Sequence, residues 1–192
     1  MSDRECDAGV IFASSRNHGN TRLLVEYVVA ARTVPIIDLS SKRIGVYDYG
    51  HANIGDDFIP LVEGLSQKAL WVFATPVYWY TMSAQLKTFV DRLTDLVTVR
   101  KDIGRNLRGR LVAVVASGTD PELPAGFESP FRLTCDYLGM KYRGAFYGQF
   151  DRDLVPSATT ASKARAYGAA LFEMTAKPSL NADARQERPR AG

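Results

Sequence analysis

The segment from residue 69 to residue 93 constrains the fold of this chain most strongly. A continuous apolar run, Ala69–Ala74, ends at Thr75-Pro76, and the apolar residues then follow the spacing of one helix face at Leu86, Phe89, Val90 and Leu93. An uninterrupted apolar run indicates a strand buried on both faces, and the later spacing indicates an amphipathic helix. The segment is therefore predicted to be a central strand, a bend and a helix.

Bulky side chains gather in the bend, where the chain is expected to reach the surface. They are Pro76, Val77, Tyr78, Trp79, Tyr80 and Met82. Ligands of open parallel sheets bind beyond the carboxyl ends of the strands, so a flat molecule is expected to cover this cluster. The alternative is a small satellite core beneath the loop.

A second informative stretch follows the first predicted strand, residues 8–13. Residues 14–21 are small and polar, and helical spacing begins at Leu23. The free N–H groups of a helix start, the hydroxyls of Ser14 and Thr21, and the Arg16 guanidinium could together bind a phosphate. The alternative is a plain turn capped by Asn20 or Thr21. Neither G-x-x-x-x-G-K-[ST] nor G-x-G-x-x-G occurs here, and His18 is interpreted as a solvated loop residue.

The remaining pattern alternates strands with helices. Further strands are predicted at 34–39, 111–116 and 141–148, and helices at 21–31, 58–65, 84–97, 127–138 and 159–174. This alternation predicts an α/β fold of three layers, a doubly wound five-stranded parallel sheet in the order 2-1-3-4-5. One domain is expected over residues 1–175, followed by a polar tail, 176–192, that is expected to be disordered.

In this strand order three ligand-like loops, 14–21, 76–82 and 117–122, end at neighbouring strands. A phosphate at the first, a flat ring at the second and hydrogen bonds to the ring edge at the third describe flavin mononucleotide (FMN). The candidate cofactor-binding residues are Ser14, Arg16, Asn20, Thr21, Pro76, Val77, Tyr78, Trp79, Ser117, Gly118 and Thr119. Tyr78, Trp79 and Tyr80 are expected to face an aromatic substrate.

Several motifs resemble those of the flavodoxin-like NAD(P)H-dependent FMN reductases and quinone reductases, over about residues 8–150. They are Ser14-Ser15-Arg16 with Gly19-Asn20-Thr21, the stretch 74–84 with Lys87 and Asp91-Arg92-Leu93, and Tyr137-Leu138-Gly139-Met140. The resemblance implies a flavodoxin-like fold, bound FMN, reduction by NADH or NADPH, and homodimers or homotetramers with active sites at subunit interfaces. It also implies that Ser14, Arg16, Asn20 and Thr21 hold the phosphate, residues 76–79 the isoalloxazine and 117–119 its pyrimidine side.

The expected activity is transfer of two electrons from a nicotinamide to a quinone, flavin, azo or nitro acceptor. The cofactor supplies that chemistry, so no side chain is assigned as catalytic. The alternatives are a one-electron flavodoxin-type carrier, which is generally strongly acidic where this chain carries +3, and a non-catalytic FMN-binding sensor module. One branch of the family holds an iron–sulfur cluster after the second strand, but residues 40–57 contain no cysteine.

Charge and cysteine content exclude other classes of function. Charges of both signs are scattered, so no nucleic-acid footprint is expected, and no apolar stretch approaches the length of a membrane span. Two cysteines without a C-x-x-C pair predict no metal site and fit a cytoplasmic protein.

Two stretches of the chain have more than one interpretation. Residues 40–57 could cover the ligand, reach a second subunit or form a surface excursion, and Arg100, Lys101 and Arg105 could attract the extra phosphate of NADPH or form a solvated connection.

Overall fold

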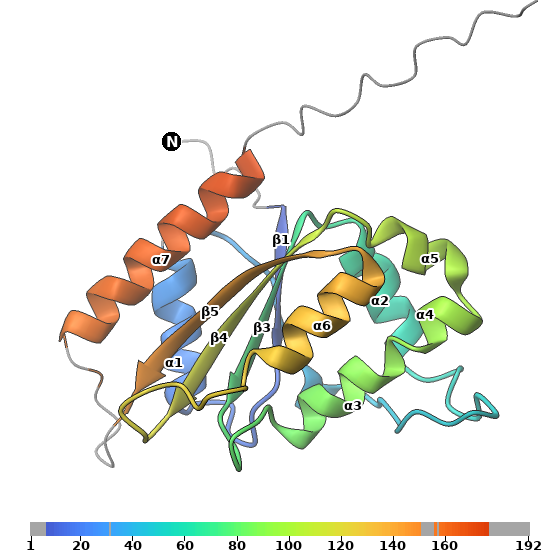
Figure 1. Ribbon diagram of the computed structural model, residues 1–192, viewed down its shortest axis with the longest axis horizontal. Coiled ribbons are helices and arrows are strands. Elements are labelled where there is room, and N and C mark those ends of the chain that lie inside the picture. Colours follow the sequence, from blue (N-terminus) through green and yellow to red (C-terminus); the bar gives the residue numbers. More distant parts are fainter. Residues whose placement is uncertain (1–6, 31, 151–155, 157, 177–192) are drawn as a thin grey trace, which may run out of the picture.

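The computed structural model describes residues 7–30, 32–150, 156 and 158–176. Figure 1 shows a central twisted sheet with helices packed on both of its faces. In chain order the elements are β1 (Ala8–Phe12), α1 (Asn20–Val29), β2 (Ile36–Asp38), the short 3₁₀ helix η1 (Leu39–Ser41), α2 (Phe58–Ser66), β3 (Leu70–Pro76), α3 (Ala84–Arg92), α4 (Asp95–Thr98), α5 (Lys101–Asn106), β4 (Leu111–Gly118), α6 (Ser129–Leu138), β5 (Lys141–Gln149) and α7 (Ala158–Ala176).

The five strands are parallel and stand in the order β2-β1-β3-β4-β5, which confirms the predicted flavodoxin-like topology. The direction of winding reverses between β1 and β3, the position at which such sheets open a crevice. The carboxyl ends of β1, β3 and β4 therefore lie side by side. The tail was expected over 176–192, but Ala176 is the last residue of α7, and residues 177–192 lie outside the described residues.

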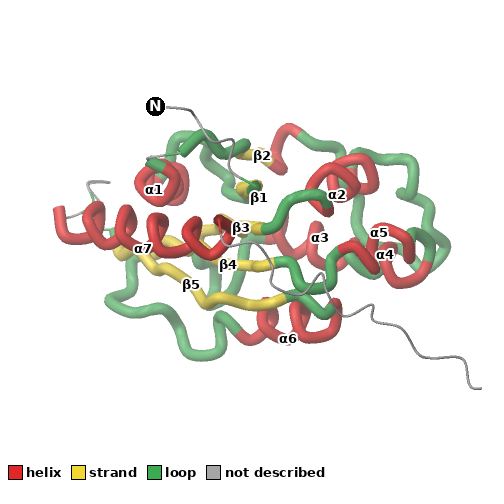
Figure 2. Tube along the Cα trace, turned by 90° about the horizontal axis from the view of Figure 1, so that it is seen from above, coloured by secondary structure: helices red, strands yellow, loops and turns green. Residues whose placement is uncertain are grey.

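Two apolar layers hold the sheet. On one face α1 and α7 pack on β1, β3 and β4, and on the other face α2 to α6 pack on the same strands, an arrangement that Figure 2 shows from above. The central strand β3 is buried along its whole length, as its apolar run predicted. Its Trp71 is fully buried, and the indole N–H donates to the carbonyl oxygen of Leu65 at 2.8 Å, which satisfies the one polar atom of that side chain.

Two positions in the fold require glycine, one for its backbone conformation and one for a close approach between helices. Gly139 takes a left-handed conformation, φ 71°, and ends α6 as the sequence predicted, because a side chain is strained there. Gly168 of α7 lies against the backbone of α1, where an added Cβ would fall 1.9 Å from the carbonyl oxygen of Val28. The absence of a side chain at Gly168 lets these two helices touch.

One local prediction was wrong, and two interpretations need local detail from the structure. The helix predicted over 84–97 ends at Arg92, and a separate short helix, α4, begins at Asp95. The Arg92 side chain bonds Asp95 at the break, with Nε 2.6 Å from Oδ2. The basic run 100–110, interpreted as a connection, contains the helix α5. At the start of α1 the N-cap residue is Gly19, and no side chain caps that helix.

Candidate functional site

The three predicted loops line one cavity at the carboxyl ends of β1, β3 and β4, with a volume of about 260 Å³. Its lining residues are Ser14, Arg16, Gly19, Asn20, Thr21, Pro76, Val77, Tyr78, Ser117, Gly118 and Thr119. The structure thus brings together ten of the eleven residues proposed from the sequence, all except Trp79. Sequence reasoning missed Gly19, which lies within the first loop but has no side chain to suggest a role.

The first loop ends at α1 with donors that have no internal acceptor. In the part of the chain that the structure describes, the N–H groups of Asn20, Thr21 and Arg22 bond no acceptor, as expected for the first turn of a helix. The Arg16 side chain is exposed at the rim, and its backbone N–H lies 3.3 Å from the Ser14 hydroxyl oxygen. This end of the cavity therefore presents the kind of donors that bind anions at helix starts.

A buried hydrogen bond joins the first loop to the third. The hydroxyl oxygens of Thr21 and Ser117 lie 2.7 Å apart, and both side chains are buried. Thr21 therefore does not cap α1, which was the alternative interpretation of this residue. The Ser117 hydroxyl lies at the end of the cavity with the free helix N–H groups, whereas the sequence argument had placed it beside the ring.

Hydrogen bonds to the ends of the neighbouring strands hold the second loop in place. The Ser83 hydroxyl donates to the carbonyl oxygen of Ala13 at 2.9 Å, and the Ser83 N–H donates to the Thr75 hydroxyl at 3.0 Å. The N–H of Val77 donates to the carbonyl oxygen of Ser117 at 2.8 Å. These contacts fix the bend after β3 to the ends of β1 and β4, and so hold two walls of the cavity at a constant separation.

The tip of the second loop is a tight turn with strained backbone. Tyr78 and Thr81 exchange backbone hydrogen bonds of 2.9 and 3.1 Å, and the two residues between them, Trp79 and Tyr80, have φ values of 47° and 68°. Positive φ at both central positions is the geometry of a type I′ turn, which Asn and Gly normally occupy. Bulky residues at these positions cost free energy, and such strain is concentrated at functional sites.

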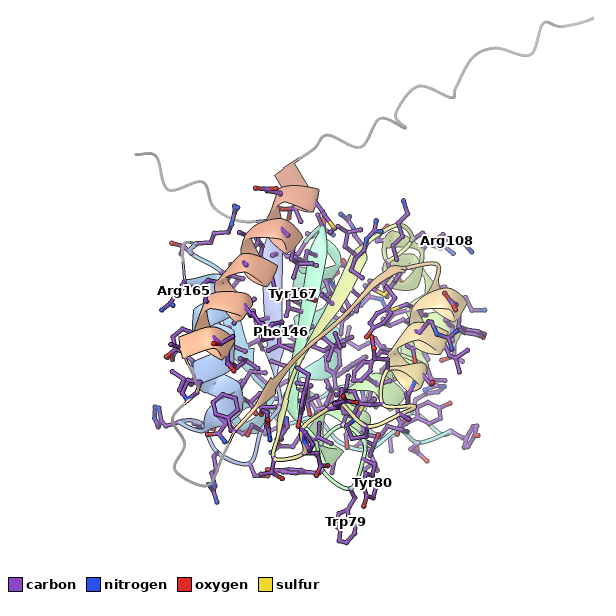
Figure 3. The ribbon with its side chains drawn as sticks, turned by 60° about the vertical axis from the view of Figure 1, so that its left-hand side comes forward. Trp79, Tyr80, Arg108, Phe146, Arg165 and Tyr167 are labelled. Carbon is purple, nitrogen blue, oxygen red and sulfur yellow. The ribbon has the colours of Figure 1, made fainter. Side chains whose placement is uncertain are left out.

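The turn separates the three aromatic residues that the sequence had grouped. Tyr78 lines the cavity, whereas Trp79 and Tyr80 point away from the body of the protein, as Figure 3 shows, with 90% and 66% of their surface exposed. Their rings touch edge to face with centroids 6.5 Å apart. The alternative of a satellite core beneath this loop does not describe these two side chains.

The third loop is tied to β5 by side chains that sequence reasoning also missed. The Tyr147 hydroxyl donates to the carbonyl oxygen of Asp120 at 2.7 Å, and the Gln149 amide donates to that of Thr119 at 3.3 Å. Burial raises the pKa of Tyr147, with a further contribution from Asp120, so this hydroxyl keeps its proton. No sequence signal links these residues to the site, because 27 and 30 positions separate the partners.

The long stretch after β2 is held to the body by a buried arginine. The Arg92 guanidinium is 1% exposed and bonds the carboxylates of Asp56 and Asp95 and the carbonyl oxygens of Gly45 and Asn53. Burial alone would raise the pKa of Asp56, but hydrogen bonds from Arg92 and from two backbone N–H groups outweigh burial and lower it. Residues 45–56 are therefore a fixed arm, with one half-buried imidazole, His51, 2.9 Å from Asp95.

The basic residues of the 100–110 run lie at the opposite end of the sheet. Helix α5 precedes the amino end of β4, whereas the cavity is at the carboxyl end, as Figure 1 shows. Arg100 pairs with Asp102 at 2.8 Å, and that ion pair lowers the pKa of Asp102 to about 2. Within one chain, Arg100, Lys101 and Arg105 are not brought to the cavity.

The residues of the cavity fit FMN in charge and polarity. Among the described residues, its lining contains a guanidinium, free helix N–H groups and the hydroxyls of Ser14, Thr21 and Ser117 at one end, Tyr78 and Pro76 along one wall, and no carboxylate. At Gly118 an added Cβ would meet the Tyr147 hydroxyl at 2.7 Å, so the backbone itself forms that wall. His18 is exposed and outside the lining, as expected.

Over 7–30, 32–150, 156 and 158–176, no three His, Cys, Asp or Glu side chains group as metal ligands would. No helix within those same ranges combines the length and apolar character that a membrane span requires.

Comparisons with known proteins agree with this geometry. A family model described as NADPH-dependent FMN reductase matches residues 7–151. A Bacillus subtilis (strain 168) protein, provisionally named as an NAD(P)H-dependent FMN-containing oxidoreductase, YwqN, is 29% identical over 153 residues, which cover 74% of this chain and 84% of that protein.

Solved structures are similar over most of their length. The Trp repressor binding protein from Bacillus subtilis superposes with a TM-score of 0.69 and 26% identity, covering 83% of this chain and 99% of that one. An NAD(P)H:quinone oxidoreductase from Methanothermobacter marburgensis superposes with a TM-score of 0.63 and 18% identity, covering 87% of this chain and 96% of that one. The second likeness is one of fold.

Proposed function

The chain belongs to the NADPH-dependent FMN reductase family, and on this premise we propose that it is an FMN-dependent oxidoreductase that passes two electrons from NADH or NADPH to a quinone, flavin, azo or nitro acceptor. The observation that carries the proposal is the cavity at the carboxyl ends of β1, β3 and β4. Among the described residues its lining combines anion donors and one aromatic wall without a carboxylate, which suits a phosphate and a flat ring.

In this proposal each loop holds one part of the cofactor. Ser14, Arg16, Asn20 and Thr21, with the free N–H groups of α1, bind the phosphate. Residues Pro76–Tyr78 contact the isoalloxazine, and the backbone at Gly118 and Thr119 binds its pyrimidine edge. Ser117 supports the phosphate end through its bond to Thr21. That bond is buried, so it ties the two loops together at the phosphate end of the cavity.

Bound FMN supplies the redox chemistry, by accepting a hydride equivalent and returning two electrons to the acceptor. The protein's residues exclude water from one face of the ring, orient it and offer N–H dipoles to the negative charge that it gains. No side chain is required as a base or nucleophile. The acceptor is proposed to stack against Tyr78, with Trp79 and Tyr80 at the outer edge of its site.

A homodimer or homotetramer is part of the proposal, because a large apolar groove lies between α3, α4 and α6. The groove has a volume of about 410 Å³, and exposed Leu133 and Tyr137 stand at its edge. Helix α3 carries the ion pair Lys87–Asp91 and α6 carries the ion pair Arg132–Asp136, so the surface beside the groove offers charges of both signs to a second copy of the chain. The low cysteine content, two in the chain, supports work in the cytoplasm.

The proposal is tested by steady-state oxidation of NADH and NADPH with a panel of acceptors, with and without added FMN. We expect turnover that depends on FMN and exceeds the rate of free FMN with at least one quinone or azo acceptor. A stable one-electron semiquinone during titration, without nicotinamide oxidation, would instead support the carrier. Bound FMN with neither property would support the sensor module.

A further inference from the structure

Three successive carbonyl oxygens, from Gly118 to Asp120, are all bound by residues 147–150, at the end of β5 and directly after it. The N–H of Phe150 donates to the carbonyl oxygen of Gly118 at 2.9 Å, the Gln149 amide to that of Thr119 at 3.3 Å, and the Tyr147 hydroxyl to that of Asp120 at 2.7 Å. A surface loop usually leaves such groups to water. Here one short segment, residues 147–150 at the end of the edge strand β5, binds all three.

The direction of these carbonyls determines where the N–H groups of the loop point. A trans peptide is planar, so its C=O and N–H bonds point in opposite directions. Since the carbonyls of Gly118 and Thr119 face β5, the N–H groups of Thr119 and Asp120 face the other way. That side of β4 carries β3, with Pro76 and Tyr78 across the cavity from Thr119.

Both N–H groups are available to a ligand. In the described portion of the structure neither the Thr119 N–H nor the Asp120 N–H bonds an acceptor. The next residue, Pro121, has no N–H, so the pair is bounded on that side. Two adjacent N–H groups pointing the same way form a site for an atom that carries partial negative charge.

Tyr147 reaches Asp120 by passing over a residue without a side chain. An added Cβ at Gly118 would lie 2.7 Å from the Tyr147 hydroxyl oxygen and 3.3 Å from a ring carbon. The glycine therefore lets the tyrosine cross the loop and fix the Asp120–Pro121 peptide. Gln149 fixes the preceding peptide, and the two side chains together leave the loop little freedom to rotate.

We propose that Tyr147 and Gln149 are positioning residues, which aim the N–H groups of Thr119 and Asp120 at the pyrimidine edge of FMN and so raise its reduction potential. The inference rests on the proposed function, because it assumes FMN in the cavity. Reduction places negative charge on that edge of the ring, so aimed N–H dipoles stabilise the reduced form more than the oxidised form. Without the hydrogen bond from Tyr147 or from Gln149 the loop can rotate, and the N–H groups then stabilise the reduced form of FMN less.

The test compares four proteins, the wild type, Tyr147→Phe, Gln149→Leu and a matched control, Tyr142→Phe. Tyr142 lies on the same strand and donates its hydroxyl to Glu128 at 2.8 Å, far from the third loop. Gln149 is exposed, so its variant is expected to fold even if Tyr147→Phe does not. The measurements are the Kd of oxidised FMN, from quenching of flavin fluorescence, and the reduction potential of bound FMN against a reference dye.

We expect Tyr147→Phe to raise the Kd of oxidised FMN about threefold and that of reduced FMN about thirtyfold, in line with the loss of well-aimed donors to a charged group. The tenfold difference between the two corresponds to a potential about 30 mV lower. Gln149→Leu is expected to shift the potential in the same direction by less. Tyr142→Phe should leave both quantities within twofold of the wild type.

The outcomes separate the two claims. Wild-type protein that binds FMN and is reduced by a nicotinamide, with unchanged potentials in Tyr147→Phe and Gln149→Leu, overturns the positioning role and leaves the proposed function intact. A reduction potential that falls equally in Tyr142→Phe also overturns the positioning role, because the change then follows from a general loss of protein stability. Wild-type protein that binds no FMN overturns the proposed function and this inference with it.

Discussion

The hydroxyl oxygens of Thr21 and Ser117 lie 2.7 Å apart although 96 positions separate them along the chain. The bond joins the start of α1 to the end of β4 across β1 and β3, and both side chains are buried. It ties the first loop, 14–21, which carries the anion donors, to the third loop, 117–122, which carries the free N–H groups of Thr119 and Asp120. The cavity between them is therefore preformed.

This bond predicts an energetic coupling between two loops that are distant in sequence. We expect Thr21→Val and Ser117→Ala each to destabilise the FMN-free protein, because each leaves a buried hydroxyl without its partner. In the double variant the loss should be smaller than the sum by about 1 kcal/mol. Urea denaturation of the four proteins measures this coupling. Strictly additive losses would show that the two hydroxyls do not interact.

Arg92 predicts the largest change in stability. Replacing it by leucine leaves the carboxylates of Asp56 and Asp95 partly or fully buried without a counter-charge, which costs about 3–5 kcal/mol. Denaturant midpoints check this value. Arg100→Ala is the matched control, because it removes an arginine from exposed ion pairs with Asp102 and Glu63 and should leave the midpoint unchanged. Equal midpoints for the two variants would contradict the account.

The lowered pKa of Asp56 predicts acid sensitivity of the arm. The ordinary value is 3.8, and the folded value lies below it because hydrogen bonds from Arg92 and from backbone N–H groups outweigh burial. A depressed folded pKa contributes stability that is complete above the unfolded value and is lost as pH falls through the folded value. The free energy of unfolding should therefore fall below about pH 4, the ordinary range for this side chain.

Asp56→Asn removes this titration and should flatten the acid limb of the stability curve, at the cost of lower stability at neutral pH. Asp136→Asn, at an exposed carboxylate on α6, is the control and should keep the acid limb. Measurements at constant ionic strength between pH 3 and pH 7 make the comparison. An acid limb in Asp56→Asn as steep as that of the wild type would argue against the assignment.

Relieving the strained turn at Trp79 and Tyr80 is expected to raise the stability of the protein and to lower its activity. Both residues have positive φ, so replacing them by Asn and Gly, which suit a type I′ turn, should stabilise the protein by about 1–2 kcal/mol. Neither side chain lines the cavity, so the Kd of FMN should stay within twofold. Turnover with aromatic acceptors should fall while the preference among acceptors changes. Unchanged kinetics would remove these residues from the acceptor site.

Regular patterns made the sheet and most of the cavity predictable. The buried run at Ala69–Ala74 and the helical spacing after Ser83 depend on residues close together in the sequence, and the strand order then brings three loops to one edge. Side-chain direction at Trp79 was not predictable, because it depends on the backbone of a turn with positive φ. The role of Tyr147 was not predictable either, because the pairing of β4 with β5 brings it to its partner, the carbonyl oxygen of Asp120.

Arg92 illustrates the same limit. From the sequence it is one residue of the Asp-Arg-Leu motif on a predicted helix, and nothing in the pattern assigns it a partner. In the structure it ends α3, bonds Asp95 at the start of α4 and reaches residues 45–56. Its burial follows from the path of the arm, and an irregular stretch has no periodicity from which that path could be predicted.

The most direct test of the central claim is an absorbance spectrum of the purified protein after incubation with FMN and removal of the excess, followed by anaerobic addition of NADH and then NADPH. The account predicts retained flavin bands that bleach fully with at least one of the two nucleotides, without a stable one-electron semiquinone. Retained bands that neither nucleotide bleaches would contradict the reductase. A colourless protein that takes up no FMN would contradict the assignment of the cavity itself.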